Sequence, residues 1–376
     1  MMALLLASQL GFYQWVGVGV DGDPADLLTQ ARRYAVAAGA QAFRFYLGPR
    51  FRYGGADHRT ILDDHALETI ILTTYAARDY GAGPDDLNLL RPWDAAAEET
   101  ERRQITELCA SLYQYYGDRP KTVVLTNAEA DDKLLEMMNY TGKPDQALAT
   151  LAAWTNARHA AITAARRPDL RLQIVHGFEI SLVNLAIASD GKGGFVKSPA
   201  GRWNALRDVV PRVRFDLLLY STYESINSPY ETQNADADPA QTGVRLRRDL
   251  DRIRTAARSS LSDLGRRLYG DRFVAAGELG FARDRYEHLP TGGVLPRLLS
   301  ALQAARDWGC PYIVLWQVFD APRAPTVTGA EQWGFGLVDR HGGHPRLKPA
   351  APSGCDTIYD CLMRENASSA RRRASP

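Results

Sequence analysis

Cysteine is scarce in this sequence: it occurs four times in 376 residues, at positions 109, 310, 355 and 361. That spacing matches no zinc-binding pattern. Cys355 and Cys361 could close a small loop in an oxidising compartment, and four free thiols fit the sequence equally well. Neither His58 nor His176 has a second histidine at ligand spacing, so we expect no metal site.

The sequence also lacks an excess of charge of either sign. Lysine and arginine together number 45, aspartate and glutamate 44, and the basic residues are scattered except in the last few positions. A nucleic-acid backbone is bound by a concentrated basic surface, so we expect no nucleic-acid partner. The glycine-containing stretch at 191–194 lacks the spacing of a phosphate-binding loop, so we expect no cofactor.

No hydrophobic run is long enough to cross a bilayer. The apolar stretch at residues 1–7 is too short for a membrane helix and lacks the basic lead-in of a signal peptide. We therefore expect no membrane segment, while a secreted or periplasmic location stays open. Residues 363–376 are expected to form a disordered tail, because the sequence from Glu365 onward has no apolar residue other than alanine.

Short β-branched and aromatic runs alternate with longer segments of helical composition. This alternation is typical of parallel strands joined by crossover helices. We predict strands over residues 12–20, 42–47, 69–75, 122–126, 172–176, 215–220, 273–276 and 312–316, and helices over 24–38, 95–116, 145–165, 244–264 and 295–308. A closed barrel needs about eight strands. No linker interrupts the series, so residues 1–362 are predicted to form a single (β/α)8 TIM barrel, an α/β fold.

Two glutamates stand where the active site of such a barrel is expected, at the carboxyl ends of the strands. Glu129 follows the fourth strand in ValValLeuThrAsnAlaGluAla, and Glu278 ends the seventh in ValAlaAlaGlyGluLeuGly. Glycoside hydrolysis needs two carboxyl groups flanking one bond, one protonated and one ionised. Glu129 and Glu278 are therefore the natural catalytic pair.

At these motifs the chain resembles the retaining (β/α)8 glycoside hydrolases of the cellulase-like clan, clan A. The resemblance covers about residues 11 to 350 and consists of short motifs. It implies that Glu278, in GlyGluLeuGly, is the nucleophile and that Glu129 is the acid/base residue. It also implies that Arg44 in PheArgPheTyr and Tyr223 in SerThrTyr support the nucleophile, and that Trp316 forms the floor of the sugar site.

Further polar residues near the strand ends are expected to bind substrate, namely Asn127, His176, Glu179 and Tyr220. In the clan an asparagine directly precedes the acid/base glutamate, whereas Ala128 separates the two here. Residues two apart in an extended strand share a face, so we expect Asn127 and Glu129 both to point into the barrel mouth. The reserve candidates for the acid are Asp131, Asp132 and Glu179.

The predicted activity is hydrolysis of an oligo- or polysaccharide with retention of configuration. Transglycosylation through the same covalent intermediate stays open. The AsnAlaGlu spacing keeps a second hypothesis, a catalytically inactive barrel that binds carbohydrate. A lyase, aldolase or isomerase is disfavoured because the lysines fall before strands or in loops. We expect the loops after strands two, five and six to set the specificity for sugar and linkage.

Overall fold

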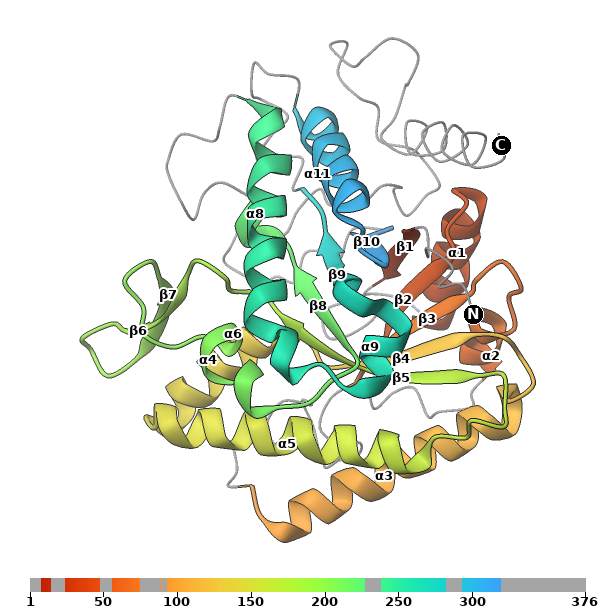
Figure 1. Cartoon of the computed structure of the whole chain (residues 1–376), viewed down its shortest axis with the longest axis horizontal. Coiled ribbons are helices and arrows are strands. Elements are labelled where there is room, and N and C mark those ends of the chain that lie inside the picture. Colours follow the sequence, from red (N-terminus) through yellow and green to blue (C-terminus); the bar gives the residue numbers. More distant parts are fainter. Residues whose placement is uncertain are drawn as a thin grey trace.

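The protein forms a closed barrel of parallel strands surrounded by helices (Figure 1). The computed structural model describes residues 8–14, 24–47, 56–74, 89, 93–226, 238–281 and 293–318. Around the barrel the strand order is β1, β10, β9, β8, β5, β4, β3, β2. The strands are β1 (Gln9–Gln14), β2 (Ala42–Leu47), β3 (Thr69–Thr74), β4 (Thr122–Thr126), β5 (Gln173–Ile180), β8 (Leu217–Ser221), β9 (Val274–Leu279) and β10 (Tyr312–Trp316). This arrangement confirms the predicted (β/α)8 fold.

Helices cover the outside of the barrel, with α3 alongside α5 and α8 alongside α11 (Figure 1). Side-chain caps set several of their first turns: Asp94 accepts a hydrogen bond from the amide of Ala97 at 2.7 Å at the start of α3. The helices are α1 (Pro24–Ala37), α2 (Ala56–Leu62), α3 (Ala95–Tyr116), α4 (Ala130–Thr141), α5 (Pro144–Ala165), α6 (Ala205–Asp208), α7 (Tyr223–Ile226), α8 (Pro239–Ala257), α9 (Asp263–Tyr269) and α11 (Val294–Trp308). Short 3₁₀ turns occur at Val210–Arg212, Arg258–Ser260 and Gly270–Arg272.

The barrel interior is packed with side chains, and it leaves no room for one at Gly177. A Cβ atom there would lie 2.7 Å from Cδ1 of Leu219 and 2.9 Å from Cγ1 of Val124. Val124, Gly177 and Leu219 therefore face inward from β4, β5 and β8. Phe178, the next residue on β5, points outward, and its ring stacks 6.3 Å from that of Phe215. This alternation of side-chain direction decides which residues reach the mouth of the barrel.

A β-hairpin follows β5 and projects from the barrel body (Figure 1). Its strands β6 (Ala186–Ser189) and β7 (Phe195–Ser198) pair antiparallel. Gly191 and Gly193 have φ of 73° and 97° in the turn, a backbone conformation that favours glycine. Asn139 of α4 binds the backbone amide of Phe195 at 2.7 Å, which anchors the hairpin to α4.

The observed element bounds differ from the predicted ones in three informative places. Strand β5 continues to Ile180 instead of ending at residue 176. The predicted helix at 244–264 is two helices, because α8 ends at Ala257 and α9 starts at Asp263. Helix α4 and the hairpin were not predicted. The predicted end of the first strand (residues 15–20), Cys355, Cys361 and the tail lie outside the described residues.

Within the described part of the chain, no helix combines the length and the apolar character needed to span a bilayer.

Candidate active site

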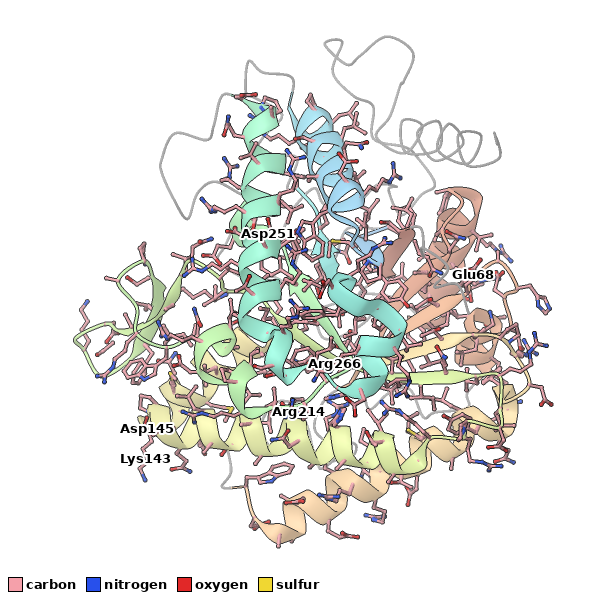
Figure 2. The ribbon with its side chains drawn as sticks, in the orientation of Figure 1. Glu68, Lys143, Asp145, Arg214, Asp251 and Arg266 are labelled. Carbon is pink, nitrogen blue, oxygen red and sulfur yellow. The ribbon has the colours of Figure 1, made fainter. Side chains whose placement is uncertain are left out.

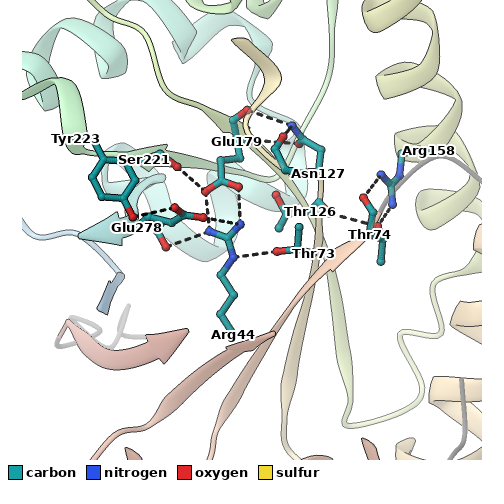
Figure 3. A network of polar contacts seen from close by, with 12 residues as sticks. Arg44, Thr73, Thr74, Thr126, Asn127, Arg158, Glu179, Ser221, Tyr223 and Glu278 are labelled. Atoms are coloured by element: carbon teal, nitrogen blue, oxygen red, sulfur yellow. Dashed lines mark hydrogen bonds and ion pairs between the residues drawn. The ribbon is translucent and has the colours of Figure 1, made fainter. Parts of the chain in front are cut away.

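Arg44 is the hub of a buried polar network at the carboxyl end of the barrel (Figure 3). Its side chain extends inward from β2 and is 1% exposed. Nε donates to Thr73 Oγ1 at 2.9 Å, and one terminal nitrogen donates to the carbonyl oxygen of Gly277 at 3.1 Å. The two terminal nitrogens also bind the two carboxylate oxygens of Glu179, at 2.6 and 2.5 Å. A second carboxylate, that of Glu278, lies 3.4 Å from the same guanidinium.

A bulge in β9 directs Glu278 into the mouth. Tyr220 of β8 is paired with Ala276, but the next residue, Ser221, is paired with Glu278, so Gly277 is the extra residue. Such a bulge re-aims the following side chain. A Cβ atom at Gly277 would lie 2.8 Å from Cβ of Leu219 and 3.0 Å from Oε1 of Glu179, so this position requires glycine.

Glu278 has one cationic and one hydroxyl partner. Arg44 lies near Oε1, and the hydroxyl of Tyr223 donates to Oε2 at 3.1 Å (Figure 3). Burial raises the pKa of Glu278 to about 8, and the charge of Glu179 also raises it. Arg44 and the hydrogen bond from Tyr223 act in the opposite direction, because both favour the ionised form. These two neighbours are the groups that can hold a charged carboxylate here.

Glu129 lies close enough to Glu278 for their charges to interact. It stands directly before the first residue of α4 and is partly exposed. Burial raises the pKa of Glu129 well above its usual range, and the charges of Asp132 and Glu278 raise it further. Lys197 of the hairpin forms an ion pair with Asp132 and lowers the pKa of Glu129. Glu129 therefore tends to keep its proton, and it lies near Glu278, whose ionised form is favoured by Arg44 and Tyr223.

Trp316 borders the same network on the β10 side. Its ring lies edge-on to the ring of Tyr13, with centroids 4.6 Å apart, and it is partly exposed. Tyr13 lies on β1, between β10 and β2, and the guanidinium of Arg44 on β2 lies 4.3 Å from the centroid of the Tyr13 ring. The peptide bond between Trp316 and Gln317 is cis. Through Tyr13, the ring of Trp316 thus adjoins the end of the barrel that carries Arg44 and Glu278.

Asn127 does not take the expected place. Strand β4 ends at Thr126, and Glu129 has φ −44° and ψ 110° at the start of a helix, so residues 127–129 are not an extended strand with a common face. The side-chain amide of Asn127 is held by the backbone of Glu179: it donates to the carbonyl at 3.1 Å and accepts from the amide at 2.9 Å. The expectation that Asn127 points into the mouth beside Glu129 is wrong, and Asn127 joins β4 to β5.

His176 and Tyr220 point to the outside of the barrel, so the expectation that they bind substrate is wrong. Nδ1 of His176 lies 3.3 Å from Nδ1 of His159 on α5. The hydroxyl of Tyr220 lies 2.7 Å from Oγ of Ser225, which itself donates to Asp249 of α8 at 2.6 Å. Successive side chains of a strand point to opposite faces, and the neighbours of these two residues face inward: Gly177 on β5, and residues 219 and 221 on β8. His176 and Tyr220 therefore face the helices.

Glu179 and Asp131 have roles inside the protein that exclude direct contact with a substrate. Glu179 is 0% exposed, and both of its carboxylate oxygens bind Arg44. Asp131 is likewise 0% exposed and accepts hydrogen bonds from the backbone amides of Ser181, Leu182 and Ala205, at 2.9, 3.0 and 2.7 Å. Neither residue can replace Glu129 as the acid. Asp132 is exposed and remains beside it.

Among the residues that the structure describes, no three histidine, cysteine, aspartate or glutamate side chains are grouped so as to hold a metal ion. Cys109 and Cys310 are buried free thiols.

The sequence matches no protein-family model and no curated protein. The fold is similar to that of exo-beta-1,4-mannosidase Op5Man5 from Opitutaceae bacterium strain TAV5, with a TM-score of 0.58 and 17% sequence identity. The similarity covers 98% of this chain and 60% of that chain, so this chain spans less than two thirds of the length of Op5Man5.

Two further similar structures are GH5_18 variants in complex with Manβ1-4GlcNAc. The protein from Bifidobacterium longum subsp. longum has a TM-score of 0.59 and 16% identity, over 96% of this chain and 78% of that chain. The protein from Streptomyces cattleya has a TM-score of 0.59 and 13% identity, over 97% of this chain and 93% of that chain. At such identities the similarity establishes the shared barrel fold.

Proposed function

We propose that this chain is a retaining glycoside hydrolase in which Glu278 is the nucleophile and Glu129 the general acid and base. The observation that carries the proposal is the unequal surroundings of the two carboxyl groups. Arg44 and Tyr223 favour the ionised form of Glu278, whereas Asp132 and Glu278 itself favour the protonated form of Glu129. Burial raises the pKa of both groups, that of Glu278 to about 8, so the pair loses its first proton only near that pH. That proton comes from Glu278, because Arg44 and Tyr223 contact its carboxylate. A double displacement requires a pair in this state, with one carboxyl group ionised and the other protonated.

The reaction follows from these two protonation states. Ionised Glu278 attacks the anomeric carbon while Glu129 donates its proton to the departing oxygen, and a glycosyl ester on Glu278 results. Glu129, now ionised, removes a proton from water, and that water displaces Glu278 from the sugar. The face of Trp316 would carry the sugar ring, because flat aromatic rings pack well on the apolar face of a pyranose.

The names of the similar proteins suggest which sugar to test first. Op5Man5 is an exo-beta-1,4-mannosidase, and the two GH5_18 variants were solved with Manβ1-4GlcNAc. We therefore propose a β-mannoside as the first candidate substrate. Whether the covalent intermediate is resolved by water or by a second sugar depends on the leaving-group side of the site.

The second candidate is a barrel that binds carbohydrate without cleaving it. The engagement of Asn127 with the backbone of Glu179 favours this candidate, because the site then lacks the substrate-facing asparagine that the resemblance implied.

Purified protein and its Glu278→Gln variant, assayed on 4-nitrophenyl β-mannoside, Manβ1-4GlcNAc and a panel of other glycosides, separate the two candidates. We expect the wild type to release product with retained configuration by NMR, and the variant to lose at least about 1,000-fold in kcat/KM while keeping its fold. Binding of a sugar without cleavage would support the second candidate. An inverted product, or substantial activity in the variant, would remove Glu278 from the nucleophile role.

A further inference from the structure

Glu179 is the one carboxylate of the network that is sealed from solvent. Asn127 holds its backbone on both sides, and Ser221 donates to its Oε1 at 3.0 Å (Figure 3). The missing side chain at Gly277 leaves the space that Oε1 occupies. Three separate features, at Asn127 after β4, at Ser221 of β8 and at Gly277 of β9, therefore fix Glu179 in one position.

The guanidinium of Arg44 is oriented by Glu179 more than by Glu278. Two parallel hydrogen bonds at 2.6 and 2.5 Å join it to Glu179, which is the bidentate geometry that makes arginine–carboxylate pairs strong. The contact with Glu278 is single and longer, at 3.4 Å. Thr73 and the carbonyl of Gly277 accept from other donors of Arg44, so the guanidinium cannot turn to bind Glu278 with both terminal nitrogens.

The charges in this cluster do not balance. One arginine faces two carboxylates, those of Glu179 and Glu278, and the charge of Glu179 opposes the effect of Arg44 on the pKa of Glu278. Without a charge at residue 179, Arg44 would neutralise Glu278 alone. A carboxylate held in a full ion pair is a weaker nucleophile, because its electron pairs are engaged.

We propose that Glu179 is a positioning residue that binds the fork of Arg44, so that Glu278 receives only one long contact from it and keeps a reactive carboxylate. This inference rests on the proposed function of Glu278. Glu179 touches no substrate in this scheme, and it acts through Arg44.

The test compares Glu179→Gln with Glu101→Gln, a matched control. Glu101 is also buried and paired with a buried arginine, Arg158, at 3.3 Å, but on the helix side of the barrel between α3 and α5. In Glu179→Gln we expect Glu278 to titrate about 1 pH unit lower, since the charge of Arg44 is no longer shared. The acid limb of the kcat/KM profile should move by the same amount, and the base limb should stay. Glu101→Gln should move neither limb.

Titration of ¹³C-labelled glutamate carboxyls by NMR, with the Glu278 signal identified by its loss in Glu278→Gln, gives a readout that does not need activity. A folded Glu179→Gln variant with an unchanged Glu278 titration overturns the inference. If neither the wild type nor any variant is active, the proposed function is wrong. The titration would still decide whether Glu179 controls the interaction of Arg44 with Glu278. If Glu179→Gln does not fold, a high-resolution crystal structure of the wild type decides: a bidentate pair of Arg44 with Glu179 supports the inference, and one with Glu278 overturns it.

Discussion

At the scale of single residues, the acidity of Glu129 depends on a pair of charges that the hairpin brings to it. Asp132 raises the pKa of Glu129, whereas Lys197, which forms an ion pair with Asp132, lowers it. Lys197 belongs to β7, and β7 is fixed to α4 through Asn139. The hairpin after β5 therefore acts on Glu129, the proposed general acid, through the charge of Lys197.

Opposite shifts are expected when the two charges are removed one at a time. In Asp132→Asn the pKa of Glu129 falls, so Glu129 loses its proton at lower pH and the base limb of the kcat/KM profile moves down by about 0.5–1 unit. In Lys197→Met the pKa of Glu129 rises, and the same limb moves up. Both profiles are measured on one aryl glycoside. Shifts of the same sign in the two variants would contradict the assignment of the base limb to Glu129.

The acidic residues along the chain look alike in the sequence, and the structure separates them by their partners. Glu278 and Tyr223 could be recognised because each follows an apolar run at a strand end, and the structure joins them by a hydrogen bond of 3.1 Å. The pairing of Arg44 with Glu179 could not be recognised, because the two residues are 135 positions apart and the predicted fifth strand stopped too early to give Glu179 a direction. Had the strand been predicted to continue to Ile180, the alternation of side chains would have placed His176 and Glu179 on opposite faces.

At the scale of elements, the bulge in β9 connects backbone geometry to chemistry. Regular pairing of β8 with β9 would place residue 277 where the side chain at 278 now lies, and Glu278 would then face the helices. The bulge also recurs on the other side of β9, where the register with β10 shifts between residues 313 and 315. The position of the Glu278 side chain, the proposed nucleophile, thus depends on one inserted glycine.

Gly277→Ala tests this dependence. The new Cβ would lie 2.8 Å from Cβ of Leu219, so the strand must shift, and we expect a loss of about 1–3 kcal/mol in the free energy of unfolding together with a fall in kcat/KM. Gly11→Ala on β1 is the control. Its Cβ would lie 3.0 Å from Cβ of Ala42, a comparable strain on another pair of strands. If both variants lose stability and activity in the same proportion, the bulge has no special part in placing Glu278.

The element types were predictable from the sequence, while several of their ends were not. Strand β4 and helix α3 have the predicted bounds, because β-branched residues fill the strand and Asp94 and Gly117 flank the helix. Helix α4 was not predicted, because it follows β4 after only a short turn. The residue before its first turn is Glu129, which is not one of the usual capping residues. Its place could be known only from the tertiary contacts of Asp131 with the loop after β5.

At the scale of the whole molecule, closure of the barrel joins the first described strand to the last. β1 pairs with β2 on one side and with β10 on the other, and the amide of Gln9 donates to the carbonyl of Pro311 at 2.9 Å. Residues about 300 positions apart in the sequence, among them Tyr13 and Trp316, are thereby brought into contact at the mouth. The sequence could indicate a number of strands close to that of a barrel, but pairing across this distance follows only from closure.

Closure predicts how the molecule opens. Each barrel strand is hydrogen-bonded on both sides, so β1 and β10 should lose amide protection only when the whole barrel unfolds. In the hairpin, β7 pairs with β6 at the edge of the structure and the turn between them is exposed, so β7 and the turn should open locally. Hydrogen exchange followed by mass spectrometry in increasing urea distinguishes the two cases. Exchange in β1 and β10 should accelerate steeply with urea, and exchange in the hairpin should respond weakly. Equal, weak responses in β1 and the hairpin would mean that the β1–β10 pairing opens independently of the rest of the barrel. The contact of Tyr13 with Trp316 could then not give the proposed sugar site a fixed wall.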